Sequence, residues 1–408
     1  MKILHVTPHL GGGVGKAHAA LRGTLPAGAE QTFILLEAPR DRRHVDAIAR
    51  SGARIVTAAN LDHVADLARQ ADIVQFEFWN HPRLFECLAR CAFPAMRSVF
   101  WSHISGLSPP LIPPGLMLEA MRFVFTTEAS RYSASVALLS DAARARLAVI
   151  NSGFGFVGGE KPRPARRDIP IIAYLGTVDF VKMHSGFFDV IDRLDGDVRV
   201  SVWGAADPAV RARARTMRHP ECVTFHGHTA DPAAALAAAE IFFYPLQPNH
   251  YGTAENALIE AMSLGLVPVV MDNAAERTIV RDGHSGFVAR SIEQAAPLLQ
   301  SLLSSPELRG RFSRNAADAV AQSRTPERSA QDFMILWLGM LSQAPRHCDF
   351  RSALGDSPAD WFAATQRLPG VKWEILKAKD SLQASKGTLA HFESVFAGDA
   401  SLARLRGT

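Results

Sequence analysis

A helix-like segment around residue 258 carries polar residues in a pattern suited to binding a nucleotide. Residues 251–262, YGTAENALIEAM, follow the apolar run IFFYP at 241–245 and the turn-like run QPNH. Thr253 is a typical helix N-cap residue, which would leave the backbone N–H groups of 254–256 able to bind an anion. Glu260 lies about two turns into the helix. Its carboxylate could accept hydrogen bonds from two ribose hydroxyls, or it could be an ordinary surface carboxylate.

A glycine turn near the N-terminus offers a second place for a phosphate or a sugar. The strand-like start of the chain leads into LGGGVGK, which includes Gly12 and Gly13. Glycine lets backbone amides approach a ligand, and a helix N-terminus favours anions. The flanking residues do not fit a Walker A loop. Lys16 stands where a dinucleotide fingerprint needs glycine, although Glu37 could supply its acidic residue. A plain tight turn is the alternative.

A third segment follows the strand-like run 169–175 and begins Gly176-Thr177. In a parallel α/β sheet this loop lies beyond the carboxyl end of the strand, where ligands bind. Lys182 in this loop could act as a point charge on a diphosphate. The alternative is a solvated loop lysine.

The elements that must position these residues alternate between apolar strand-like runs and helical stretches. Residues 1–157 and 169–325 each show this pattern, and a Gly-, Pro- and charge-rich linker at 158–168 separates them. We predict an α/β fold with two doubly wound, Rossmann-like domains facing a cleft. Residues 326–345 are expected to form a helix that could return to the first domain. Residues 346–408 form a C-terminal extension with no assigned role.

Composition excludes several classes of protein. The 408 residues are 48% hydrophobic and 21% charged, which indicates a globular chain. The longest strongly apolar run, 333–341, is far shorter than the about 20 residues that span a membrane. The start MKILHVTP lacks the apolar core of a signal peptide, so we expect a cytoplasmic location.

The strands expected in the first domain include one at residues 136–139, a short apolar run.

The charge balance restricts the partners. Forty-four basic and 40 acidic residues give a net charge of +4. Basic residues do not alternate with aromatic ones, so we expect no nucleic-acid binding. Peripheral contact with an anionic membrane surface is compatible with this charge. The single Asp-x-Asp triplet, Asp195-Gly196-Asp197, is expected to be a turn, and we predict no metal site.

Several segments, in order, resemble the retaining GT-B glycosyltransferases of family 4 over about residues 1–345. They are the start MKILHVTPHLGGGVGKA, the loop YLGTVDFVKMHSGF, the run CVTFHGHTADPAAALAAAEIFFYPL and the segment ENALIEAMSLGLVPVVMDNAAERTIVRDGHSGFV. The resemblance implies transfer of a sugar from a UDP- or GDP-sugar to a glycan or lipid-linked acceptor. It points to synthesis of bacterial surface polysaccharide or glycoconjugate. We expect no cofactor and no metal, because Lys182 and the helix dipole could carry the charge of the leaving group.

The resemblance also implies roles for residues. Lys182 takes the place of the donor-loop Lys, and Thr177 stands where the family has Arg. Glu260 takes the place of the ribose-binding second Glu of the signature, and Gly252 stands where the first Glu is expected. The candidate residues are: catalytic, His103, Lys182 and Glu260; donor-binding, Gly12, Gly13, Thr177, Lys182, Tyr251, Gly252, Thr253, Ala254, Glu255, Asn256 and Glu260; acceptor-binding, Lys16, Glu77, Trp79 and His103.

Four alternatives stay open. His103, at the end of the expected fifth strand, could simply cap that strand, and either Tyr251 or His250 could contact the sugar. The same frame could also serve a nucleotide-sugar epimerase or a phosphorylase. The missing Arg and first Glu would also fit a degenerate, non-catalytic binding subunit.

Overall fold

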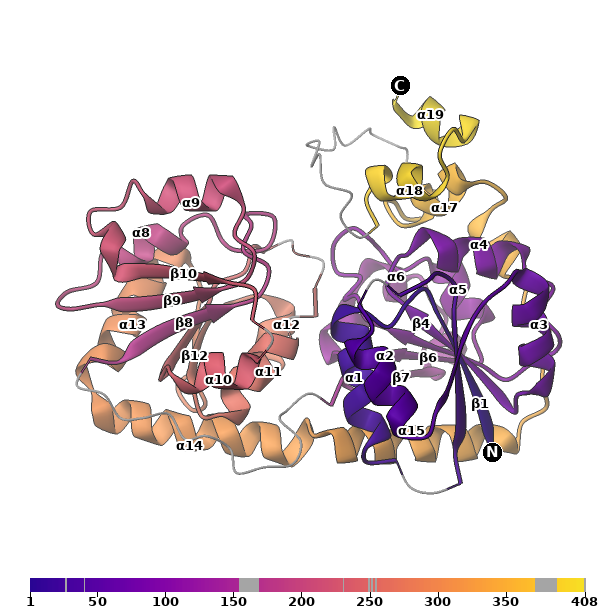
Figure 1. Ribbon diagram of the computed structural model, residues 1–408, viewed down its shortest axis with the longest axis horizontal. Helices are drawn as coiled ribbons and strands as arrows, with labels where there is room; N and C mark the ends of the chain where they lie inside the picture. Colours follow the sequence, from indigo (N-terminus) through magenta and orange to yellow (C-terminus); the bar gives the residue numbers. More distant parts are fainter. Residues whose placement is uncertain are drawn as a thin grey trace. The chain divides into compact units, whose positions relative to one another are not determined.

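The computed structural model describes residues 1–25, 28–39, 41–153, 169–229, 231–248, 250, 252–253, 255–370 and 387–406 (Figure 1). The chain divides into two compact units. One comprises Met1–Asn151 and Ser329–Thr408, and the other comprises Ser152–Arg328. The predicted linker at 158–168 lies outside the described residues.

The first unit is built on a seven-stranded parallel sheet in the order β3-β2-β1-β4-β5-β6-β7. Its strands β4 and β5 are buried along their whole length, as strands of a sheet covered on both faces are. Because the chain runs outward from β1 to β3 and then returns to β4, the strand order reverses between β1 and β4. The strands are β1 (Lys2–Thr7), β2 (Glu30–Leu35), β3 (Arg54–Thr57), β4 (Ile73–Phe78), β5 (Ser98–Ser102), β6 (Arg122–Phe125) and β7 (Leu147–Val149).

Short helices connect these strands, and one of them corrects a prediction. The expected strand at 136–139 is wrong, because residues 136 and 137 belong to α6 and residues 138 and 139 lie in no strand. The Ser133 side chain accepts a hydrogen bond from the Val136 N–H and so starts that helix, an N-cap signal that outweighs the short apolar run. The helices are α1 (Gly12–Arg22), α2 (Arg43–Arg50), α3 (Leu61–Gln70), α4 (Pro82–Arg90), α5 (Pro114–Glu119), η1 (Glu128–Tyr132), α6 (Ala134–Ala137) and α7 (Asp141–Arg144).

The C-terminal segment belongs to the first unit. On α15, the Trp337 side chain donates a hydrogen bond of 3.0 Å to Gln75 in the middle of the sheet. Helices α17 and α18, yellow-orange in Figure 1, pack against α4. The extension therefore adds its own residues to the hydrophobic core, including Phe350, Leu354, Trp361, Phe362, Phe392 and Leu402. The helices are α15 (Pro326–Leu341), α16 (Phe350–Leu354), α17 (Pro358–Ala364), α18 (Leu389–Val395) and α19 (Ala400–Arg406).

The second unit is built on a six-stranded parallel sheet in the order β10-β9-β8-β11-β12-β13. Here the strand order reverses between β8 and β11, so the prediction of two doubly wound α/β sheets is confirmed. Residues 195–197 connect α8 to β9, and Gly196 has a φ of +82°. The strands are β8 (Ile171–Leu175), β9 (Arg199–Trp203), β10 (Val223–Gly227), β11 (Ile241–Tyr244), β12 (Val267–Met271) and β13 (Phe287–Ala289).

The helices of the second unit include two long ones near its end, α13 and α14. Over the residues that the structure describes, none of the helices combines the length and the apolar character needed to cross a bilayer. The helices and the 3₁₀ turn are α8 (Phe187–Ile191), α9 (Pro208–Ala214), η2 (Pro220–Cys222), α10 (Pro232–Ala237), α11 (Glu255–Ser263), α12 (Ala274–Arg277), α13 (Ile292–Ser304) and α14 (Pro306–Ser323).

Candidate functional site

In the second unit, backbone hydrogen bonds join the two loops that leave the sheet at its reversal point. The carbonyl of Lys182 accepts a bond of 2.8 Å from the Gln247 N–H, and the His184 N–H donates one of 2.9 Å to Pro245. The Lys182 ammonium lies 5.7 Å from the centre of the Tyr244 ring, at the end of β11. Lys182 is thus held between the carboxyl ends of β8 and β11, where ligands of such sheets bind.

Glycines keep this loop close to its neighbour. Gly204, with a φ of +138°, follows β9, and a Cβ there would lie 2.1 Å from the carbonyl oxygen of Gly176. The hydroxyl of Tyr174 donates a hydrogen bond of 2.8 Å to the carbonyl of Thr177. Thr177 itself is exposed. The bond from Tyr174 therefore holds the backbone at Thr177 in place, while the Thr177 side chain is exposed.

Helix α11 carries the remaining candidates of this unit. Glu260 is only 2% exposed, and Asn256 lies in the first turn. The helix begins at Glu255, and Thr253 lies two residues before it. Gly252 and Thr253 lie in the loop before the helix. Residues 251 and 254 and the side chain of residue 255 are outside the described part of the chain.

The structure adds a buried pair that the sequence did not reveal. His250 is 6% exposed, and its Nδ1 accepts a hydrogen bond of 3.1 Å from the Gly252 N–H. Its Nε2 lies 3.3 Å from Oε1 of Glu276, which is fully buried and also accepts a bond from Asn273. Both nitrogens of His250 therefore contact protein groups and anchor the loop before α11. Nothing in the sequence marked Glu276 as buried.

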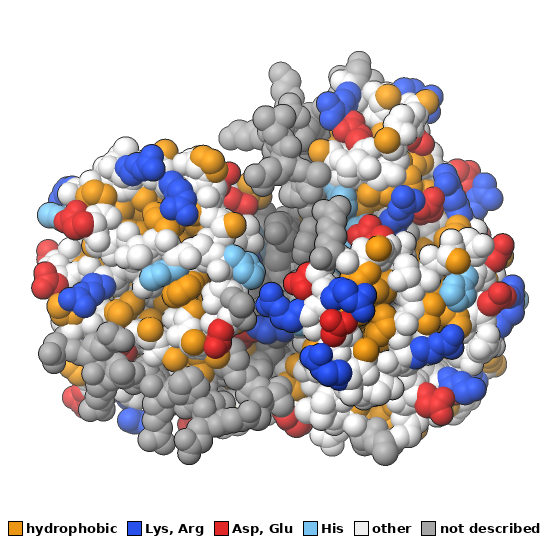
Figure 2. Space-filling view, in the orientation of Figure 1, with side chains coloured by type: hydrophobic (Ala, Val, Ile, Leu, Met, Phe, Trp, Pro, Cys, Tyr) orange, Lys and Arg blue, Asp and Glu red, His pale blue; other side chains and the backbone are white. Residues whose placement is uncertain are grey.

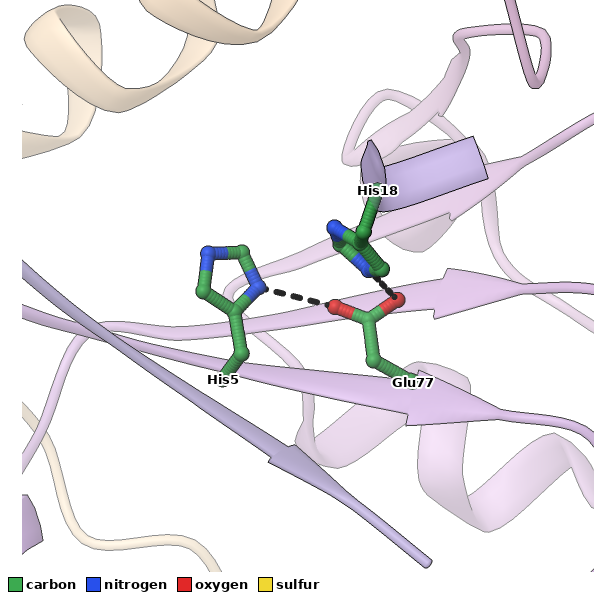
Figure 3. Close-up of side chains that lie close together, drawn as sticks. All are labelled: His5, His18 and Glu77. Atoms are coloured by element: carbon green, nitrogen blue, oxygen red, sulfur yellow. Dashed lines mark hydrogen bonds and ion pairs between the residues drawn. The ribbon is translucent and has the colours of Figure 1, made fainter. Parts of the chain in front are cut away.

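In the first unit, Glu77 on β4 is the centre of a buried polar cluster (Figure 3). Its Oε1 lies 2.9 Å from Nδ1 of His5 and accepts a bond of 3.0 Å from Gln75. Its Oε2 lies 3.0 Å from Nε2 of both His18 and His103. Figure 3 shows His5 and His18 directed at different oxygens of the carboxylate. Four groups, on β1, β4, α1 and the segment after β5, thus converge on one carboxylate with no exposed surface.

This environment shifts two pKa values in the cluster. Burial alone would raise the pKa of Glu77, but the charge of His18 and hydrogen bonds from His103, His18 and His5 hold it well below its usual range. Burial lowers the pKa of His5 to about 4, against a partial opposing effect of its bond to Glu77. Near neutral pH, Glu77 is therefore ionised and His5 is neutral.

The structure brings some predicted residues of this unit together and leaves others apart. His103 follows β5, is half-buried, and is bound to Glu77. Glu77, also predicted for the acceptor site, has no exposed surface, and its Oε2 lies 3.0 Å from Nε2 of His103. Trp79 is 5% exposed and packs edge-on against His9 and His81.

The glycine turn leads directly into α1. Gly12, with a φ of +62°, is the first residue of the helix, Gly13 is the second, and partly exposed Lys16 lies one turn on. The predicted turn is therefore the start of the helix itself. This helix begins at the carboxyl end of β1, beside the reversal of the sheet.

Among the residues that the structure describes, two groups have the ligand types that metal ions prefer, with ligand atoms within 4.8 Å of one another. One is His5, His18 and Glu77, where protein hydrogen bonds already account for the carboxylate. The other is His9, Glu37 and His81.

Figure 2 shows Lys and Arg side chains interspersed with Asp and Glu side chains over the described residues of one face.

Comparisons with known proteins agree with this architecture. Residues 169–305 match the family model of the glycosyl transferases group 1. The chain matches no curated protein by sequence. It resembles a solved glycosyltransferase from Rickettsia africae, with a TM-score of 0.67 and 13% identity, over 84% of this chain and 99% of that one.

Two further solved structures are similar. HepE of Anabaena, in complex with UDP-glucose, has a TM-score of 0.66 and 16% identity, over 83% of this chain and 100% of its own. The sucrose-phosphate synthase of Thermosynechococcus elongatus has a TM-score of 0.65 and 15% identity, over 84% and 99%. The match to the glycosyl transferases group 1 model thus lies within the second Rossmann-like unit, and the chain has the GT-B fold of these solved structures.

Proposed function

We propose that this protein is a retaining glycosyltransferase that moves a sugar from a UDP- or GDP-sugar to a glycan or lipid-linked acceptor. The observation that carries the proposal is the position of two residues at the reversal point of the second sheet. Lys182 lies on the loop after β8, and Glu260 lies on α11. They lie within residues 169–305, which match the group 1 family model.

The chemistry follows from charge. When the bond between the sugar C1 and the diphosphate oxygen breaks, negative charge develops on the diphosphate. Lys182 and the N-terminal amides of α11 would stabilise this charge, and preorganised stabilisation of this kind is usually the largest catalytic contribution. Glu260 would accept hydrogen bonds from the ribose hydroxyls. Reaction without a metal ion is part of the proposal.

Retention of configuration requires the acceptor oxygen to bond to C1 on the face that the diphosphate leaves. The departing diphosphate oxygen takes the acceptor's proton. His103 is proposed to lie over the sugar, and the bond from Glu77 fixes the orientation of its ring. Gly12, Gly13 and Lys16 are proposed to line the same region from α1.

Relatives support the choice of donor and pathway. HepE was solved with UDP-glucose, and a further similar structure is a lipopolysaccharide outer core galactosyltransferase, with a TM-score of 0.63 and 14% identity. We therefore favour a UDP-sugar and an acceptor of the bacterial surface. This acceptor would be reached from the cytoplasm, with peripheral contact at the membrane.

Calorimetry with UDP and GDP tests the proposal. We expect Glu260→Gln to weaken binding about 10- to 100-fold, because hydrogen bonds to a charged group contribute about 1.5–3 kcal/mol. The control is Glu307→Gln, an exposed carboxylate on α14. Lys182→Ala should lower kcat with UDP-sugars. If neither nucleotide binds the wild type, or if Glu260→Gln behaves as the control does, the proposal is wrong. Binding without turnover would favour the non-catalytic alternative.

A further inference from the structure

A chain of buried hydrogen bonds leads from helix α15 to His103. Nε1 of Trp337 donates a bond of 3.0 Å to Oε1 of Gln75, and Nε2 of Gln75 donates one of 3.0 Å to Oε1 of Glu77. Oε2 of Glu77 lies 3.0 Å from Nε2 of His103. Trp337 is 2% exposed, and Gln75 and Glu77 have no exposed surface. The chain is therefore shielded from water until it reaches His103.

The direction of these bonds follows from the groups at the two ends. An indole N–H can only donate, and an ionised carboxylate can only accept. The amide of Gln75 must therefore turn its oxygen to Trp337 and its NH₂ group to Glu77. The opposite orientation would set two donors against each other at one end and two acceptors at the other.

Strand geometry places Gln75 and Glu77 for this contact. Both lie on β4, two residues apart, and side chains two apart on a strand share one face of the sheet. His5 pairs with Gln75 on the neighbouring strand β1, and its Nδ1 lies 2.9 Å from Oε1 of Glu77. Gln75 and His5 thus hold one carboxylate oxygen, and the other oxygen is directed at His103.

The ring of His103 is the part that this carboxylate can orient. The backbone is fixed separately, because the His103 N–H donates a bond of 2.8 Å to the carbonyl of Phe78. Rotation of an imidazole about χ2 is broad and does not by itself select one orientation. Contact with an ionised carboxylate selects one, because it requires a hydrogen on Nε2. A neutral ring then carries no hydrogen on Nδ1.

We propose that Trp337 and Gln75 are positioning residues of the sugar-transfer site. They hold the carboxylate of Glu77, which in turn sets the ring orientation and the tautomer of His103. This rests on the proposed transferase function, in which His103 lies over the sugar. It changes the role of Glu77 from an acceptor-binding residue to a positioning residue, and it gives α15 a part in the reaction.

Trp337→Phe tests the first bond of the chain. It removes the Nε1–H donor and keeps an aromatic ring against Phe333, whose ring centre lies 5.2 Å from that of Trp337. The matched control is Trp361→Phe on α17. Trp361 is also buried, and its Nε1 donates a bond of 2.9 Å to the carbonyl of Gly355. Gln75→Met, which has no amide, is a second test variant that leaves Trp337 in place.

Release of UDP from UDP-glucose, UDP-galactose and UDP-N-acetylglucosamine, with water as the acceptor, measures the effect on the reaction. We expect both test variants to lower kcat about tenfold relative to Trp361→Phe, because misplacement by about 1 Å can cost about 100-fold in rate. UDP affinity, measured by calorimetry, should not change. In a His103→Ala background, Trp337→Phe should leave kcat nearly unchanged, because a residue that acts through His103 has no effect without it.

Long-range ¹H–¹⁵N NMR of the histidine side chains reports the tautomer without any turnover. The His103→Ala variant identifies the His103 signal. We expect the wild type and Trp361→Phe to show His103 with its hydrogen on Nε2. Trp337→Phe and Gln75→Met should show a mixture of both tautomers.

The outcomes separate this inference from the proposed function. The inference is overturned if Trp337→Phe and Gln75→Met retain either the kcat or the His103 tautomer of Trp361→Phe. It is also overturned if the losses in kcat from Trp337→Phe and His103→Ala multiply, because the chain would then have a purely structural role. A wild type that releases no UDP would overturn the transferase function, and the NMR spectra would still show whether Trp337 sets the tautomer of His103.

Discussion

Individual residues in this protein obtain their chemistry from neighbours that are distant in sequence. Glu77 and His103 were predicted from their positions at strand ends, but the 3.0 Å contact between them depends on the pairing of β4 with β5. His5 and His18 were not predicted, because a histidine in an apolar strand or helix is usually a core residue. Only the packing of α1 on the sheet brings them to Glu77.

The buried His5 predicts a pH dependence of stability. The unfolded state takes up a proton near pH 6.5, its ordinary pKa, whereas the folded state does so only near pH 4. The unfolded state thus binds more protons in this interval, and stability is lost as the pH falls from 6.5 to 4. The difference in pKa corresponds to about 3 kcal/mol.

Urea unfolding at pH 7, 5.5 and 4.5 measures this effect. His5→Asn keeps a side-chain N–H donor near Glu77 but does not titrate, so its stability should fall less over the same interval. The exposed His219→Asn variant serves as the control and should follow the wild type. An identical pH dependence in all three proteins would contradict the prediction.

Among the elements, loops after the strands are fixed by glycine and by caps. The glycine turn at residues 11–13 was recognised from sequence, as was the loop at 176–182. The contacts that these loops make were not recognised, because the partner in each close contact follows another strand. The carbonyl of Gly176 next to Gly204 is the clearest case.

Gly204→Ala therefore tests the loop that carries Lys182. The new Cβ would meet the Gly176 carbonyl at 2.1 Å, so backbone must move. Gly196→Ala is the matched control, because Gly196 also has a positive φ, +82°, but nothing within 4 Å. We expect the control to lose about 1 kcal/mol from backbone strain alone.

Gly204→Ala should lose more stability than the control and should also weaken UDP binding, whereas Gly196→Ala should bind UDP as the wild type does. Thermal unfolding and calorimetry measure the two effects. Equal losses in both variants would mean that the close approach does not constrain the loop.

For the whole molecule, the extension is the main finding beyond the two sheets. Among the described residues, 350–370 and 387–402 place six large apolar side chains in the core of the first unit, against α4 and its neighbours. From sequence this segment was an extension without a role. Its apolar residues are spread over several short helices, so no periodic pattern marked a buried face.

Trp361→Ala measures the contribution of the extension. Trp361 has no exposed surface, and removal of such a side chain typically costs about 3–5 kcal/mol. The unfolding of the first unit should therefore move to lower urea concentration. Leu338→Ala, at a 55% exposed position on α15, should have little effect. If Trp361→Ala unfolds at the same urea concentration as Leu338→Ala, the extension is not part of the core.

The sequence by itself determined the alternation of strands and helices, because the spacing of apolar residues and the glycine turns are properties of short stretches of the chain. It therefore predicted the two doubly wound sheets, and it placed Lys182 and Glu260 beyond strand ends. Their roles, like that of His103, stay predictions. Only the tertiary structure decided which side chains meet: the histidines around Glu77, the His250–Glu276 pair, and His391 beside His81. These contacts join segments up to hundreds of residues apart, and they form only when burial and strand order bring the segments together.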